Sequence, residues 1–200
     1  MPSLLLVGYG NMGRAMLTSW QKASAHGISD FYVIAPKNSA GGMFFRSLAE
    51  FSDNIEPDVI VFAVKPQQLG DIVPEYKNRF GNKPLYISIA AGKTLAFFSQ
   101  ILGEDARVIR SMPNTPAMVG KAITALCASS NISETQKILA TTLMEAFGKV
   151  VWVEEKNMNA VTAISGSGPA YVFLFLEVLT KAGINAGLET EVAKILATAT

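Results

Sequence analysis

The sequence has very few of the side chains that act directly in catalysis. Its 200 residues contain one cysteine and one histidine. One cysteine excludes an intrachain disulfide and a cysteine zinc cluster, and one histidine leaves no partner for a catalytic triad or a metal site. We therefore expect Cys127, which lies in an apolar stretch, to be a buried and inert thiol, and His26 to take no part in catalysis.

The sequence also lacks a strong charge of one sign and a long apolar run. Its formal net charge of +1 gives no electrostatic reason to expect nucleic acid, a membrane or an acidic surface as a partner. The apolar run at the N-terminus is too short for a signal peptide, and no stretch reaches the ~18 apolar residues of a membrane helix. We therefore expect a cytoplasmic protein with a small-molecule ligand.

A glycine motif stands between a strand and a helix at the start of the chain. Apolar residues 4–7 lead into Gly8, Gly10 and Gly13, the G-x-G-x-x-G spacing of dinucleotide-binding turns. The first glycine permits the tight turn, the second lets the backbone approach a pyrophosphate, and the third allows close packing of the helix on the strand. The phosphates then bind unpaired N–H groups at the start of a helix that we expect over residues 11–25.

Alternating strand and helix patterns follow this motif. We expect strands at 31–35, 58–64, 85–90, 107–110, 123–128 and 150–153, and helices at 43–50, 67–80, 94–102 and 134–147, the last capped by Ser133. The continuous apolar run at 58–64 is typical of a parallel strand covered on both faces. The pattern predicts an α/β fold with a doubly wound, Rossmann-like parallel sheet in residues 1–156.

Residues 157–200 have a different character and are predicted to be entirely helical. Residues 171–176 are apolar around the whole helix circumference, so this helix must be buried on all sides. The sequence ends inside a helical pattern at 192–197 that has no glycine stop. We expect the beginning of a truncated, all-helical C-terminal domain that pairs with a second copy.

The residues after the second strand indicate which dinucleotide binds. An NAD site usually has an acidic residue there to hold the ribose 2′-hydroxyl. Residues 33–39 contain no acid, and Asp30 lies at the wrong end of the strand. The polar residues are Lys37, Asn38 and Ser39, which suit a 2′-phosphate, so we favour NADP (NADPH) and keep NAD as a possibility. The alternative is a solvated turn with an incidental lysine.

Three further segments are candidates for the site. Residues 63–66, which include Lys65 and Pro66, follow the strand at 58–64 at the edge where doubly wound sheets bind ligands. Ala90 and Ala91 end the next strand, and their small side chains leave room for a flat ring, although core packing explains them equally well. The Ser-Gly-Ser-Gly-Pro run at 165–169 suits a helix cap, an anion site or an ordinary turn between helices.

Taken together, these segments resemble the pyrroline-5-carboxylate reductase family, the last enzyme of proline synthesis. The matching segments are 8–13, 63–66, 90–92, 112–116 and 165–171. They occur in family order over nearly the whole chain. The resemblance implies an NAD(P)H-dependent oxidoreductase that reduces the cyclic imine 1-pyrroline-5-carboxylate to L-proline, and a homodimer or higher homo-oligomer formed through the C-terminal helices.

The resemblance also suggests positions for the ligands. The cofactor-binding residues are expected to be Val7, Gly8, Tyr9, Gly10, Asn11, Met12, Gly13, Lys37, Ala63, Val64, Lys65, Pro66, Ala90 and Ala91. Asn114, Ser165 and Ser167 are expected near the substrate. No side chain is assigned as catalytic and no metal is expected, because a protonated imine already has an electrophilic carbon and the cofactor supplies the hydride.

Two other functions stay open at this point. The family continues beyond the length of this sequence through a substrate-binding segment, so the chain could be a cofactor-binding homologue or fragment without turnover, and we expect little or no reductase activity from these 200 residues alone. Another two-domain NADP reductase, acting on a hydroxy acid or an imine, shares the architecture. Lys181 is the only lysine well placed for acid catalysis in that case.

Overall fold

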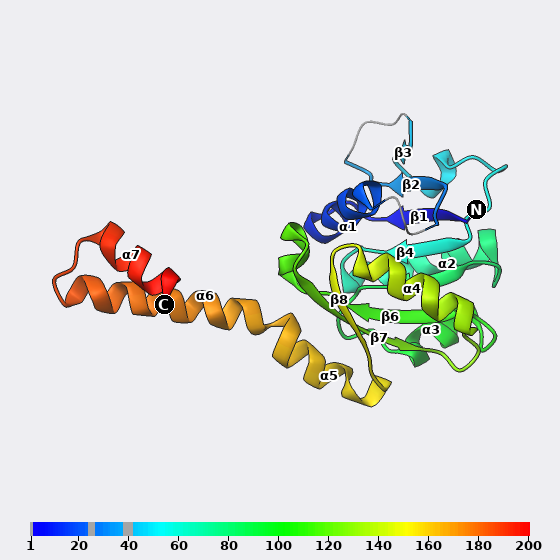
Figure 1. The fold of residues 1–200 in the computed structure, drawn as a ribbon. Helices are drawn as coiled ribbons and strands as arrows, with labels where there is room; N and C mark the ends of the chain where they lie inside the picture. The colour runs from blue at the N-terminus through cyan, green and yellow to red at the C-terminus, as the bar shows by residue number, and fades with distance from the viewer. Residues whose placement is uncertain (1, 24–26, 38–41) are drawn as a thin grey trace.

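A single twisted sheet forms the centre of the structure, a computed structural model that describes residues 2–23, 27–37 and 42–200. The strands are β1 Ser3–Val7, β2 Asp30–Ile34, β3 Phe44–Phe45, β4 Val59–Phe62, β5 Leu85–Ser88, β6 Val108–Met112, β7 Ala122–Ala128 and β8 Gly148–Trp152. Their order in the sheet is β3-β2-β1-β4-β5-β6-β7-β8, and Figure 1 shows β3, β2, β1 and β4 side by side in that order. The predicted doubly wound α/β fold is confirmed.

Helices cover both faces of this sheet. They are α1 Asn11–Lys22, α2 Leu69–Phe80, α3 Leu95–Leu102 and α4 Glu134–Glu145. Along β1, Leu4 and Leu6 join one buried cluster with α1 and α4, whereas Leu5 and Val7 join another with α2 and α3. Successive side chains of a strand point to opposite faces, so the apolar run is buried on both sides.

The last two strands, β7 and β8, run against the predicted parallel direction. β7 pairs antiparallel with β6, while every other neighbouring pair is parallel. A parallel return needs a crossover of about a dozen residues or more, usually a helix. The connection at 113–121 is shorter and contains only the 3₁₀ turn Thr115–Val119. The chain therefore turns back beside β6.

The helix predicted at 43–50 is wrong. The segment contains the short strand β3 and the 3₁₀ turn Leu48–Glu50. Phe44 stacks edge-on against Tyr9 with ring centroids 5.2 Å apart, and Phe45 against Phe51 at 5.0 Å. Since the two rings contribute to different faces of the sheet, the local period is that of a strand.

The C-terminal residues form a helical arm that extends away from the sheet (Figure 1). It comprises α5 Met158–Val161, a π turn at Thr162–Gly166, α6 Gly168–Asn185 and α7 Thr190–Ala199. The predicted helical character is confirmed, but there is no interhelical turn at 165–169. The N–H of Ser167 instead donates to the carbonyl of Thr162 at 2.8 Å, so the helix continues through the π turn.

The apolar helix α6 is exposed in the single chain. Phe173 and Phe175 have 66% and 64% of their surface accessible. The sequence predicted that α6 is buried on all sides, but a single copy of the chain does not bury it. By length and composition, Glu155–Asn185 is also long and apolar enough to cross a membrane, contrary to the expectation that no segment reaches that length.

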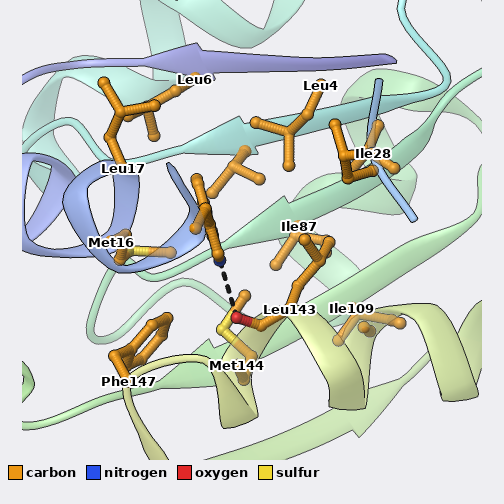
Figure 2. Packing of buried hydrophobic residues seen from close by; sticks show 14 of the residues in the cluster. Leu4, Leu6, Met16, Leu17, Ile28, Ile87, Ile109, Leu143, Met144 and Phe147 are labelled. Carbon is orange, nitrogen blue, oxygen red and sulfur yellow. Dashed lines mark hydrogen bonds between the residues drawn. The ribbon is translucent and has the colours of Figure 1, made fainter. Parts of the chain in front are cut away.

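A buried tryptophan links α1 to α4. The indole N–H of Trp20 donates to the carbonyl of Leu143 at 2.7 Å, drawn as the dashed line in Figure 2. Leu143 lies in the last turn of α4, where helix carbonyls have no partner within the helix. The bond therefore satisfies one of the α4 end groups inside the core and fixes the two helices on this face of the sheet.

We expect Trp20→Phe to lower the free energy of unfolding by about 1–3 kcal/mol, because a buried carbonyl loses its donor. Urea denaturation should show a lower midpoint with an unchanged slope. Trp152→Phe is the matched control, since the indole of Trp152 donates to the Thr141 hydroxyl at the surface. An equal loss in both variants would contradict the role assigned to Trp20.

Candidate cofactor site

The glycine turn between β1 and α1 is shaped by close backbone contacts. Gly8 has φ +101°, and a Cβ there would lie 2.7 Å from the carbonyl oxygen of Ala63 at the end of β4. A Cβ on Gly13 would lie 2.5 Å from the carbonyl oxygen of Gly8. Both distances are too short for any side chain, so these two glycines are required by the fold itself.

Gly10 differs from the other two glycines. Its backbone is extended, with φ −76°, and a Cβ at this position would meet nothing within 4 Å. Neither conformation nor packing explains a glycine here. Gly10 precedes α1, and no side chain caps the first turn of that helix. An open space beside free helix N–H groups is what a bound pyrophosphate needs.

A cleft of about 540 Å³ opens at the carboxyl ends of β1, β2 and β4. It brings together the following predicted residues: Val7, Gly8, Tyr9, Gly10, Lys37, Ala63, Val64 and Lys65. The edge of the sheet and the position beside the glycine turn are those at which doubly wound folds bind dinucleotides.

Six of the predicted cofactor residues do not line this cleft. They are Asn11, Met12, Gly13, Pro66, Ala90 and Ala91. Gly13 is buried beneath the turn, and Met12 packs against the core of the α1 face. Ala90 is buried and Ala91 exposed in the loop between β5 and α3, one strand further along the same edge. Their contact with a cofactor stays a prediction.

Several residues of the cleft were not predicted from the sequence. Among them are Arg46 and Ser47, which follow β3, and Gln68, Glu75 and Tyr76 from the α2 region. Arg46 was not predicted because residues 43–50 were expected to form a helix. Two adjacent aromatic residues followed by Arg-Ser are the signal that could have indicated a strand end here.

The end of β2 carries the residues expected to select the cofactor. Lys37 is exposed and lines the cleft, and residues 33–37 contain no acid. Asp30 begins β2 and therefore lies at the opposite end of the strand. Asn38, Ser39 and His26 lie outside the described residues.

The expected substrate residues are held in hydrogen bonds between the sheet and the arm. The side-chain amide of Asn114 accepts from the Ile123 N–H at 3.0 Å and donates to the Ser165 carbonyl at 3.2 Å. The Ser165 hydroxyl donates to the Val161 carbonyl at 3.1 Å. Asn114 and Ser165 thus meet, and Ser167 follows at the start of α6. Substrate contact by these three residues stays a prediction.

A partly buried carboxylate just before the arm also ties the arm to the sheet. Glu155 accepts from the Arg110 guanidinium at 2.6 Å and from the Leu95 N–H at 2.6 Å. Arg110 is almost fully buried in β6, and Leu95 begins α3 just after the loop with Ala90 and Ala91. No sequence pattern indicated this junction. It places the start of the arm beside the loop that contains Ala90 and Ala91.

Burial makes the thiol of Cys127 a poor nucleophile. Burial raises the pKa of the Cys127 thiol to about 11, with smaller opposing and reinforcing effects of Arg110 and Glu155. Cys127 is 3% exposed, so the prediction of a buried cysteine is confirmed. Among the described residues, no group of three or more His, Cys, Asp or Glu side chains is arranged to hold a metal ion.

The sheet, the glycine turn and the cleft define a dinucleotide-binding oxidoreductase with a helical C-terminal domain. The family model for NADP oxidoreductase, coenzyme F420-dependent, matches residues 3–92, and the model for pyrroline-5-carboxylate reductase dimerisation matches residues 155–200. The chain belongs to the pyrroline-5-carboxylate reductase family.

Individual relatives support this assignment. Pyrroline-5-carboxylate reductase of Vibrio alginolyticus is 37% identical over 201 residues, which cover 96% of this chain and 73% of the relative. That of Arabidopsis thaliana is 41% identical over 145 residues, 72% of this chain and 52% of the relative. The crystal structure of Plasmodium falciparum pyrroline carboxylate reductase with NADP bound has a TM-score of 0.87 at 31% identity, over 98% of this chain and 74% of that one.

We expect Gly10→Val to fold normally and to lose dinucleotide binding, at a cost of more than about 2 kcal/mol, because its side chain fills space that only a ligand would occupy. Isothermal titration calorimetry with NADPH and a denaturation curve measure the two effects. Gly13→Ala is the contrasting variant and should lose stability, since its Cβ meets the Gly8 carbonyl. Binding of normal strength in Gly10→Val would show that this glycine has no role at the phosphates.

Proposed function

We propose that this chain reduces 1-pyrroline-5-carboxylate to L-proline with NADPH as the hydride donor. The proposal rests on Gly10, which lies at an open cleft although neither packing nor conformation requires a glycine there. It agrees with a family similarity that extends over nearly the whole chain. A cofactor-binding homologue without turnover is not favoured, because the similarity includes both the sheet and the arm.

The residues of the chain would bind and orient the reactants. The first turn of α1 offers N–H groups to the pyrophosphate beside Gly10, and Lys37 holds the adenosine end. The small residues Ala90 and Ala91 leave room for the nicotinamide ring, with Asn114 and Ser165 at the far side of the same edge. When bound, the cofactor supplies a hydride from nicotinamide C4 to the imine carbon.

This reaction needs little from reactive side chains. The protonated imine accepts the hydride and becomes the secondary amine of proline, so no covalent nucleophile is required. The contribution of the protein is then to hold the two reacting carbons in line and close together, which accounts for a large part of the rate in such reactions. A cytoplasmic location fits a small, soluble substrate and cofactor.

The reaction is tested by NADPH oxidation in the presence of 1-pyrroline-5-carboxylate, with proline identified as the product. Little or no activity was expected from these 200 residues alone, whereas the proposed reaction requires the wild-type chain to consume NADPH and imine in equal amounts and Gly10→Val not to do so. NADPH binding without any turnover would favour a cofactor-binding protein instead.

The cofactor preference is tested at Lys37. We expect wild-type protein to bind NADPH more tightly than NADH, and Lys37→Glu to weaken NADPH by roughly tenfold or more, about 1.4 kcal/mol, because a cation facing the 2′-phosphate becomes an anion. Calorimetry with both cofactors measures this. Equal affinities of the wild-type protein for the two cofactors would overturn the preference.

The exposed apolar face of α6 is proposed to pair with a second copy of the chain. Phe175→Glu should turn the dimer into a monomer in light scattering while helicity is retained, because a charge would enter the interface. Ile138→Glu is the control, since Ile138 is similarly exposed, at 61%, but lies on α4. A wild-type monomer, or equal effects of both variants, would contradict pairing through α6.

A further inference from the structure

Arg46 reaches the cofactor cleft because of the register of the shortest strand. β3 pairs with β2 so that Phe45 lies beside Ile34, and the N–H of Ala35 donates to the Phe45 carbonyl at 2.8 Å. Arg46 therefore leaves the sheet at the same edge as Ala35 and Lys37. Both cations line the cleft, on loops that follow adjacent strands.

The Arg46 side chain has no competing anion in the part of the chain that the structure describes. The nearest acid in sequence, Glu50, accepts the backbone N–H of Arg46 at 3.0 Å. The Arg79 guanidinium, by contrast, forms an ion pair with Asp53 and donates a hydrogen bond to the Phe51 carbonyl. The acid that lines the cleft, Glu75, belongs to α2. The edge formed by β2 and β3 is thus cationic.

The backbone around Arg46 is held in place on both sides. On one side, β3 is hydrogen-bonded to β2, and the ring of Phe45 packs against that of Phe51. On the other, the Arg79 guanidinium donates to the carbonyls of Leu48 and Phe51. Arg46 and Ser47 lie between these two anchors. A cation on such a fixed loop is preorganised for an anionic group of a ligand.

We propose that Arg46 is the principal determinant of NADPH selectivity, through an ion pair between its guanidinium and the phosphate on the adenosine 2′-oxygen. The assignment rests on the proposed NADPH-dependent function and names a residue of that site. A guanidinium presents a planar fork that binds two phosphate oxygens at once, whereas Lys37 offers a point charge. Ser47 provides a hydroxyl beside it.

The experiment compares Arg46→Gln with Lys37→Gln and Lys22→Gln. The last is the matched control, because Lys22 is an exposed cation at the end of α1 that does not line the cleft. Dissociation constants are measured by calorimetry for NADPH and NADH, and for the fragments adenosine 2′,5′-bisphosphate and AMP. Circular dichroism confirms that each variant is folded.

We expect Arg46→Gln to weaken NADPH and the bisphosphate by about tenfold or more and to change NADH and AMP by less than about twofold, with a smaller loss in Lys37→Gln and none in Lys22→Gln. Arg46→Lys should restore part of the selectivity, since it keeps the charge and loses the fork. The selectivity of the wild-type protein should also decrease with rising salt concentration.

Equal weakening of NADPH and NADH in Arg46→Gln, or no change in either, overturns the assignment. If that variant still oxidises NADPH with the imine at wild-type selectivity, the proposed reaction stands and only the role of Arg46 is lost. Failure of the wild-type protein to bind either dinucleotide contradicts both the proposed function and this assignment.

Discussion

The close approach of Gly8 to Ala63 is the contact on which the architecture of the site depends. With the Gly8 Cα hydrogen facing the Ala63 carbonyl, β1 and β4 meet as neighbours, and the chain turns sharply enough to start α1 at the same edge. Gly13 then lets α1 pack against the turn that it has just left. Any side chain at Gly8 or Gly13 would push these elements apart. The same geometry starts α1 directly after Gly10, which lines the cleft.

The order of elements could be predicted from the sequence because the strands are short apolar runs separated by amphipathic helices. Leu4–Val7 alternate between two cores, and Ser133 caps α4 through a capping box, so local patterns and the final fold agree. The glycine turn could also be predicted, because its strand, turn and helix all lie within a short stretch of sequence. The residues of the cleft that belong to this turn were therefore identified.

The features that sequence reasoning missed depend on partners distant in the chain. β3 exists because Phe44 and Phe45 find Tyr9 and Phe51, and only this pairing places Arg46 at the cleft. The direction of β7 follows from the length of its connection, and the π turn from a backbone shift of one residue. None of these has a distinctive local period, so propensity alone could not reveal them.

The contacts between the sheet and the arm hold together two parts of the chain that the proposed reaction uses: the loop with Ala90 and Ala91, and the start of the arm. Glu155 bonds to Arg110 beneath the sheet edge and to the first N–H of α3, while Asn114 holds the carbonyl of Ser165. Arg110 is almost fully buried, so loss of Glu155 would leave its charge without a partner inside the protein. The start of the arm is thereby fixed relative to the loop with Ala90 and Ala91. A hydride transfer depends on the distance between two carbons, so a rigid joint between the cofactor loop and the arm would help to set that distance.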